Sequence, residues 1–176
     1  MYQIYSKFQN LPVHPDKIIV EDSNSGYEFF NTIGQENNIL CESAGGKSNI
    51  FSKLQSIGQE TVCVIADGAA IGPEMNRLYE ITERKSNIVL YFPESFEWLI
   101  LKSGLVTDGD IKTILQEPEA YIESKDYFSW ERYFTKLLIE RTQDTYLQYQ
   151  KTKLNPVYLH DKIKHTIISV MQGIIL

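Results

Sequence analysis

The sequence predicts an α/β fold with a mainly parallel, Rossmann-like sheet of four strands and a C-terminal helical subdomain. Four short apolar runs recur about every 20 residues, and a helical pattern separates each pair. Parallel strands need crossovers of a dozen or more residues, which this spacing supplies. After the fourth run the pattern is helical only. We therefore expect an α/β domain over 1–104 and a helical extension, packed on it, over 105–176.

The four strands are the apolar runs Lys17–Glu21, Asn38–Glu42, Val62–Asp67 and Asn87–Phe92. The third run does not alternate with polar residues, which is typical of a strand buried on both faces. Residues 1–16 show no clear period and contain Pro12 and Pro15, so we expect a lead-in without regular structure.

Helices are expected between and after the strands. Ser23 or Asn24 can cap the first, and Gly72-Pro73 opens the third. The C-terminal part is predicted as helices over Ser95–Lys102 and Thr107–Gln116 (capped by Thr107 and Asp108), a turn over Pro118–Glu123, a long helix from Ser129 to about Lys151, and a last helix through Leu159–Met171.

The 176-residue composition, 43% hydrophobic and 23% charged, is that of a globular protein. The sequence has no apolar run near the roughly 18 residues that cross a membrane, and its start lacks a signal-peptide pattern. Cys41 and Cys63 fall in predicted buried strands without a disulfide framework. We therefore expect a cytoplasmic protein that does not bind membranes.

Charge is distributed unevenly along the chain. Residues 1–124 hold 9 basic and 18 acidic side chains, whereas residues 125–176 hold 8 and 5. The basic tail also carries aromatic residues, a combination that can bind nucleic acid. Their helical spacing favours core and interface positions over base stacking.

All four predicted strands end at or beside a carboxylate. These acids are Glu21-Asp22, Glu42, Asp67 and Glu94. Ligands of open α/β sheets bind where the carboxyl ends of the strands meet. Several carboxylates at one edge repel one another unless a cation or proton lies between them. The pattern therefore predicts a metal site.

A glycine-rich turn, SAGGKS at 43–48, follows the second strand and opens a helix. Lys47 and Ser48 could bind a phosphate there, together with backbone N–H groups. The full P-loop pattern needs glycine where this chain has Cys41. Three other interpretations of this turn stay open: a different kind of phosphate contact, a small-nucleotide sensor, and a tight turn without a ligand.

Two motifs carry a resemblance to a known family. Glu21 ends the first strand in IIVED, and DGAAIG at residues 67–72 follows the third. Over roughly residues 17–100 the chain resembles the Toprim domain of topoisomerases, primases and nucleases, whose pattern is a glutamate and then Asp-x-Asp-x-x-Gly. The resemblance implies Mg²⁺ held by the aspartates and Glu21 as general acid/base in phosphodiester cleavage or transfer.

The chain departs from this pattern at the second aspartate, which is Ala69. Asp67 would then be the main Mg²⁺ ligand, with help from Glu21, Asp22 or Glu74. Glu94 and Glu97 are further sources of the missing carboxylate, although a glutamate in a first helical turn also stabilises the helix by itself.

The string as a whole also looks like a small, mostly uncharacterised bacterial family that occurs beside ATPase genes. Other compact Toprim-like proteins act as effectors of ATPase partners in phage defence, so the resemblance implies an ATPase partner. Two functions stay open: a Mg²⁺-dependent enzyme acting on nucleic acid, and a catalytically degenerate module that docks on a partner protein. Self-association into a homo-oligomer is compatible with both.

Overall fold

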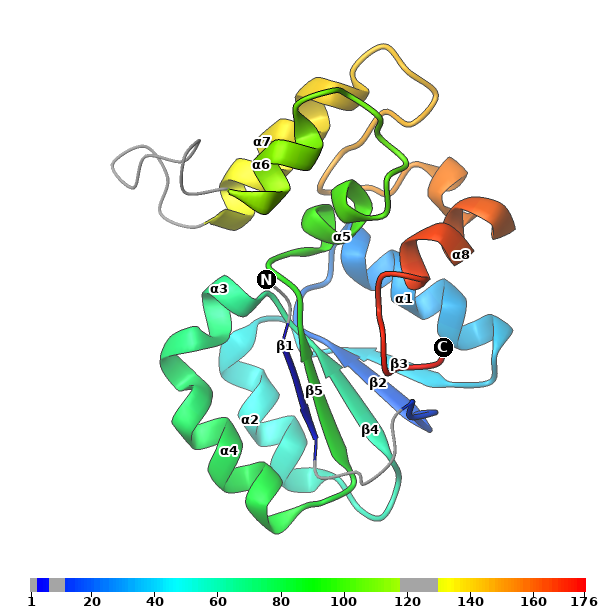
Figure 1. Cartoon of the computed structure of the whole chain (residues 1–176). Helices are drawn as coiled ribbons and strands as arrows, with labels where there is room; N and C mark the ends of the chain where they lie inside the picture. The colour runs from blue at the N-terminus through cyan, green and yellow to red at the C-terminus, as the bar shows by residue number, and fades with distance from the viewer. Residues whose placement is uncertain (1–2, 7–11, 118–129) are drawn as a thin grey trace.

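A computed structural model describes residues 3–6, 12–117 and 130–176 (Figure 1). It contains one sheet in the order β1-β5-β4-β2-β3. The strands are β1 (Gln3–Ser6), β2 (Lys17–Val20), β3 (Leu40–Ser43), β4 (Val62–Ile65) and β5 (Ile88–Phe92). The predicted parallel sheet is confirmed, because β3, β2, β4 and β5 pair in parallel.

The strand β1 lies in the segment expected to lack regular structure. It pairs antiparallel with β5, with Gln3 opposite Phe92 and Ser6 opposite Val89. Four residues are too few to show a period, so this pairing could not be recognised from the sequence. The sheet therefore has a fifth strand at one edge.

Helices cover both faces of the sheet (Figure 1). They are α1 (Ser25–Glu36), α2 (Lys47–Ser56), α3 (Gly68–Ile71), η1 (Gly72–Glu74), α4 (Met75–Arg84), α5 (Phe96–Lys102), α6 (Ile111–Gln116), α7 (Trp130–Thr142), η3 (Pro156–Leu159) and α8 (Asp161–Ile168). The side chains of β2 alternate between the two cores. Ile18 and Val20 pack on the α1 side, and Ile19 packs on the α2 and α4 side.

The C-terminal helices share a core with the sheet. Phe134, Leu138, Tyr158 and Ile167 are almost fully buried in the cluster that includes Ile18 and the α1 side of the sheet. Within the described part of the chain, no helix is long and apolar enough to span a membrane. The two cysteines are buried free thiols.

The expected helix through Lys151 ends early, at Thr142. The hydroxyl of Thr142 donates to the Leu138 carbonyl (2.7 Å) and accepts from the backbone N–H of Tyr149 (3.0 Å), while Asp144 has a left-handed φ of 61°. These features turn the chain, and residues 143–155 form a connecting segment between α7 and η3. The turn expected over Pro118–Glu123 lies outside the described residues.

The helix expected from Thr107 is also shorter, because α6 begins at Ile111. Asp108 and Asp110 form ion pairs with Arg141 of α7 instead of extending the helix. Asn24 is the N-cap of α1, but its side chain makes no capping hydrogen bond. The hydroxyl of Ser95, a cap that was not predicted, caps α5 and accepts from the Trp98 N–H at 3.1 Å.

Candidate functional site

The carboxyl ends of β2 and β4 lie side by side at the point where the sheet changes its winding direction. From β2 the chain runs through α1 to β3, which lies on one side of β2 in the sheet. From β3 it returns through α2 to β4, which lies on the other side of β2. The helices α1 and α2 cover opposite faces (Figure 1). Open α/β sheets bind ligands at such a switch point.

A small cavity of about 20 Å³ lies at this switch point, lined by Glu21, Asp22 and Asp67 among apolar side chains. This is room for one water molecule or one small ion. The structure therefore brings together three of the four acids that the sequence proposes as metal ligands.

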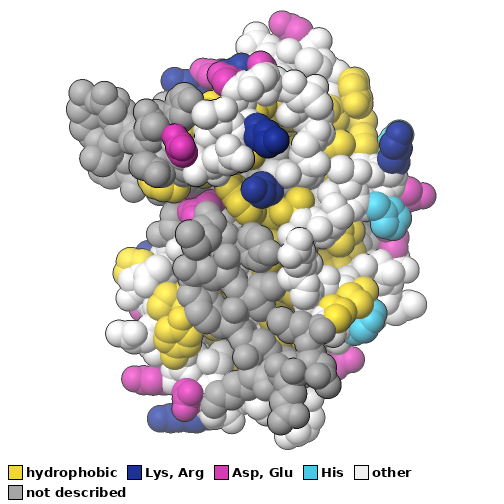
Figure 2. Space-filling view, viewed as in Figure 1, with side chains coloured by type: hydrophobic (Ala, Val, Ile, Leu, Met, Phe, Trp, Pro, Cys, Tyr) yellow, Lys and Arg dark blue, Asp and Glu magenta, His cyan; other side chains and the backbone are white. Residues whose placement is uncertain are grey.

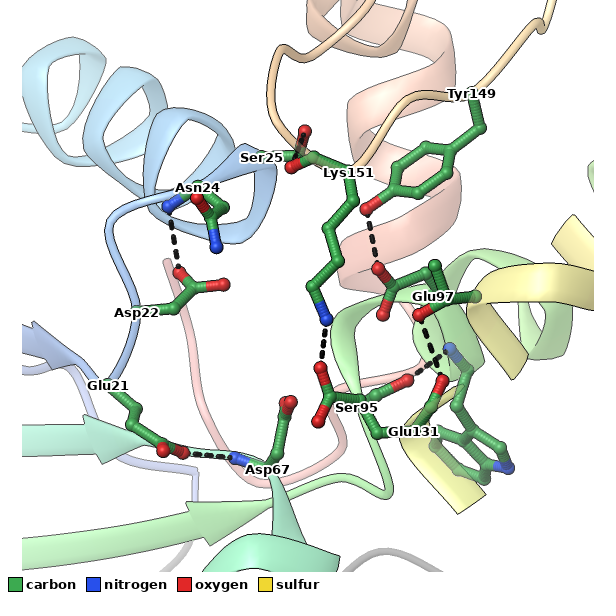
Figure 3. Close-up of polar contacts among 12 residues, drawn as sticks. Glu21, Asp22, Asn24, Ser25, Asp67, Ser95, Glu97, Glu131, Tyr149 and Lys151 are labelled. Carbon is green, nitrogen blue, oxygen red and sulfur yellow. Dashed lines mark hydrogen bonds and ion pairs between the residues drawn. The ribbon is translucent and has the colours of Figure 1, made fainter. Parts of the chain in front are cut away.

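Glu21 and Asp67 are joined directly. The Oε2 atom of Glu21 accepts a hydrogen bond from the backbone N–H of Asp67 at 3.1 Å (Figure 3). Burial raises the pKa of Glu21, and the hydrogen bond from Asp67 partly opposes this rise.

Asp67 occupies the N-cap position of α3, which begins at Gly68 and not at Gly72 as expected. Its side chain makes no capping hydrogen bond. The Gly68 N–H donates to the Pro93 carbonyl at 2.7 Å, and a Cβ at Gly68 would lie 3.1 Å from that oxygen. Glycine thus allows the end of β4 to pack closely on the end of β5, and the Asp67 carboxylate stays available to the cavity.

Asp22 is held by the start of α1. Its Oδ1 atom accepts from the Asn24 N–H at 3.4 Å, and its carbonyl accepts from the Ser43 hydroxyl at 2.6 Å. Burial and then the Glu97 carboxylate raise the pKa of Asp22, against the hydrogen bond from Asn24.

Two further carboxylates approach from the C-terminal helices. Burial, followed by neighbouring carboxylates, holds the pKa of Asp67 well above its ordinary value. These neighbours are Glu131, Glu97, Glu21 and Asp22. We call the five acids Glu21, Asp22, Asp67, Glu97 and Glu131 the carboxylate cluster.

Sequence reasoning named Glu97 as a candidate but missed Glu131, Tyr149 and Lys151. Glu97 is only 3% exposed and accepts a hydrogen bond from the Tyr149 hydroxyl at 2.8 Å. Lys151 forms an ion pair with Glu131, and its ammonium group points toward the cluster (Figure 3). Nothing in the sequence indicated this role for Lys151. In the expected helix from Ser129 to about Lys151, it would be an ordinary residue at the helix end.

Other acids at the strand ends do not join this cluster. Glu42 lies between Lys17 (2.9 Å) and Lys53 (3.0 Å), and hydrogen bonds from these lysines lower its pKa. Glu74 and Glu94 do not line the cavity. The prediction that all the strand-end acids crowd one edge is therefore wrong for Glu42, whose charge is neutralised by two lysines.

The glycine-rich turn has a different geometry from a phosphate-binding loop. The N–H groups of Gly45 and Gly46 donate to the Ser43 hydroxyl (3.0 Å) and the Glu21 carbonyl (2.8 Å), so they are not available to a phosphate. Lys47 and Ser48 are exposed at the start of α2. Lys47 approaches the Ala70 carbonyl (3.4 Å), and its charge lowers the pKa of Glu21.

The donor chemistry of the cavity fits Mg²⁺. Its polar side chains are carboxylates, the hard oxygen ligands that Mg²⁺ and Mn²⁺ prefer. Across residues 3–6, 12–117 and 130–176, however, no three acidic, histidine or cysteine side chains form a ready-made metal-binding group. Mg²⁺ commonly uses one or two carboxylates with waters and substrate phosphate, so the residues fit the ion without a closed protein cage.

The fold and the site together define a class: an α/β protein with a Rossmann-like parallel sheet and a carboxylate cluster at its switch point. Comparison of the chain with protein-family models, curated proteins and solved structures finds no match in any of the three. The Toprim resemblance stays a prediction from the two motifs.

Proposed function

We propose that this protein cleaves or transfers phosphodiester bonds of nucleic acid with the help of Mg²⁺ or Mn²⁺ bound at the carboxylate cluster. The observation that carries this proposal is the convergence of Glu21, Asp22 and Asp67 on one cavity at the sheet's switch point. Crowded carboxylates with raised pKa values are common at functional sites, where catalytic groups need shifted pKa values.

Asp67, with Glu21 or Asp22, would hold the cation. When bound, such an ion supplies Lewis-acid stabilisation of charge on the phosphoryl oxygens. Among the chain's own groups, Glu21 is the candidate for proton transfer, because it lines the cavity and burial raises its pKa. Exposed Lys47, beside Glu21, would position a phosphate as a point charge.

Calorimetric titration with MgCl₂ and MnCl₂, followed by incubation with single- and double-stranded DNA and RNA, tests the proposal. We expect Asp67→Asn to weaken cation binding and Glu21→Gln to abolish cleavage. Glu74→Gln is the matched control, since Glu74 does not line the cavity. Product formation that neither cluster substitution reduces would contradict the proposal.

The second candidate is a catalytically degenerate module that docks on a partner protein. It is favoured by Ala69 at the second aspartate position and by the absence of a ready-made metal group in the described residues. On the face seen in Figure 2, the described basic and acidic side chains are interspersed and form no broad basic surface among themselves. The Toprim resemblance suggests an ATPase in phage defence as the partner for either candidate.

Cation binding distinguishes the two candidates. The docking module predicts no divalent-ion binding and stable co-purification with an ATPase encoded beside it. Light scattering of the isolated protein measures self-association in the same preparation. The enzyme predicts binding and cleavage without the partner, or cleavage that the partner stimulates.

A further inference from the structure

The connecting segment 143–155 is anchored beside the carboxylate cluster by backbone contacts to α1. The hydroxyl of Ser25 donates to the carbonyls of Gln150 (2.8 Å) and Lys151 (2.9 Å), and the Ser25 N–H also donates to the Lys151 carbonyl. Ser25 is fully buried. The backbone position of Lys151 is therefore set by the start of α1, three residues after Asp22.

A buried tyrosine fixes the segment on its other side. Tyr149 is 2% exposed, packs edge-to-face on Tyr158 and donates its hydroxyl to Glu97. Three residues beyond Lys151, the Leu154 N–H donates to a carboxylate oxygen of Glu28 at 3.0 Å. Contacts on both sides of Lys151 therefore hold its backbone in place. An ordinary surface lysine lacks such contacts.

From this anchored backbone the Lys151 side chain extends toward the space between Asp67 and Glu131 (Figure 3). Its ammonium group pairs with Glu131, and both side chains are partly shielded from water, with 34% and 24% exposed. Burial opposes the charge of Lys151, but the carboxylates of Glu97, Glu131 and Asp67 outweigh it and raise its pKa. Lys151 is therefore a charged ammonium within the cluster at neutral pH.

We propose that Lys151 is the built-in counter-ion of the carboxylate cluster and competes with a divalent cation for it. The inference rests on the proposed function, whose cation site it regulates. The charges of Lys151 and Asp67 interact, so a cation held by Asp67 would lie near the ammonium group, and like charges repel. Lys151 therefore weakens cation binding at the cluster as long as its side chain keeps this position.

This role predicts opposite effects on stability and on affinity. Without the ammonium, the cluster loses its internal positive charge, so the metal-free protein becomes less stable. The same cluster should bind Mg²⁺ and Mn²⁺ about tenfold more tightly, as expected for a coupled pair of sites. A merely structural lysine would lower stability without raising affinity.

The test is calorimetric titration of the full chain with MgCl₂ and MnCl₂, with thermal unfolding in EDTA and in Mg²⁺. We expect Lys151→Met to raise cation affinity about tenfold, and Lys151→Arg, which keeps the charge, to remain near the wild type. Exposed Lys153, in the same segment, is the matched control as Lys153→Met. Lys151→Gln replaces the Met variant where the latter does not fold.

Unchanged or weaker cation binding by the folded Lys151 variants would overturn the inference, even where the wild type cleaves nucleic acid. Tighter binding without cleavage by any variant would support the inference and reject the enzymatic function. Absence of divalent-ion binding by the wild type and by all variants would overturn both.

Discussion

The backbone N–H of Asp67 donates to the Oε2 atom of Glu21, and this bond of 3.1 Å links the ends of two neighbouring parallel strands. One oxygen of Glu21 thus positions the backbone that carries Asp67, and its other oxygen remains for a cation or a proton. The two motifs of the Toprim resemblance are joined through this single contact.

Glu21→Gln should separate the chemical role of Glu21 from its structural role. A glutamine oxygen can still accept the bond from Asp67, so the free energy of unfolding should change by less than about 0.5 kcal/mol. Cleavage, measured with labelled oligonucleotides, should fall by about 100-fold or more, because the amide cannot transfer the proton.

Glu21→Ala also removes the acceptor and should cost about 1 kcal/mol more than Glu21→Gln in chemical denaturation. Equal stability of the two variants would show that the hydrogen bond does not support the fold. Equal cleavage by the wild type and Glu21→Gln would remove Glu21 from the chemistry.

The contribution of Asp67 to the stability of the metal-free protein should fall as the pH rises above about 4. The folded-state pKa of Asp67 is well above its unfolded value, because of burial and the neighbouring carboxylates. The folded state therefore binds the proton more tightly than the unfolded state, and its advantage is lost as the pH rises through the folded pKa.

Asp67→Asn removes the carboxylate, and with it the loss of stability that ionisation of Asp67 causes at high pH. We expect it to stabilise the metal-free protein by about 1 kcal/mol at pH 8 and to have little effect near pH 4, measured by urea unfolding in EDTA. Glu42→Gln is the opposite control: the pKa of Glu42 is lowered by Lys17 and Lys53, so its loss should not stabilise the protein at any of these pH values. A destabilised Asp67→Asn variant at pH 8 would contradict the assignment.

Gly68→Ala should disturb the cation site through the backbone. A Cβ at Gly68 would lie 3.1 Å from the Pro93 oxygen and 3.4 Å from that of Phe92, so the start of α3 must shift. We expect a loss of about 1–2 kcal/mol in stability and weaker Mg²⁺ binding.

Gly72→Ala is a matched glycine control for that substitution. Gly72 has helical φ and ψ angles, and no atom lies within 4 Å of the added Cβ. Alanine there should leave stability unchanged or raise it slightly. Equal effects of the two substitutions on Mg²⁺ binding would argue against a positional role for Gly68.

Lys47→Ala should weaken nucleic-acid binding by a few-fold and reduce its salt dependence by about one counter-ion, without affecting stability. Lys47 is exposed at the start of α2, so little packing is lost. Fluorescence anisotropy over a salt series measures this effect. Exposed Lys162 on α8 provides the control as Lys162→Ala, and an equal loss in both variants would indicate only a general effect of net charge.

The parallel strands β2 to β5 were predictable, because a strand buried in a parallel sheet is a continuous apolar run with helical crossovers between the runs. The end of α7 was not. Residues 143–151 include Tyr146, Leu147 and Tyr149, which continue a helical pattern, but the Thr142 hydroxyl binds the Tyr149 N–H and Asp144 adopts a left-handed φ. Tertiary contacts thus outweighed local propensity.

The sequence by itself determined the sheet and placed Glu21, Asp22 and Asp67 at its carboxyl edge, because strand ends follow directly from where apolar runs stop. Only the tertiary structure decided which charges face these acids. Glu42 is neutralised by Lys17 and Lys53, whereas Glu97 and Glu131 join Asp67, and Lys151 becomes their counter-ion. That selection depends on how helices distant in sequence pack on one another, which local patterns do not encode.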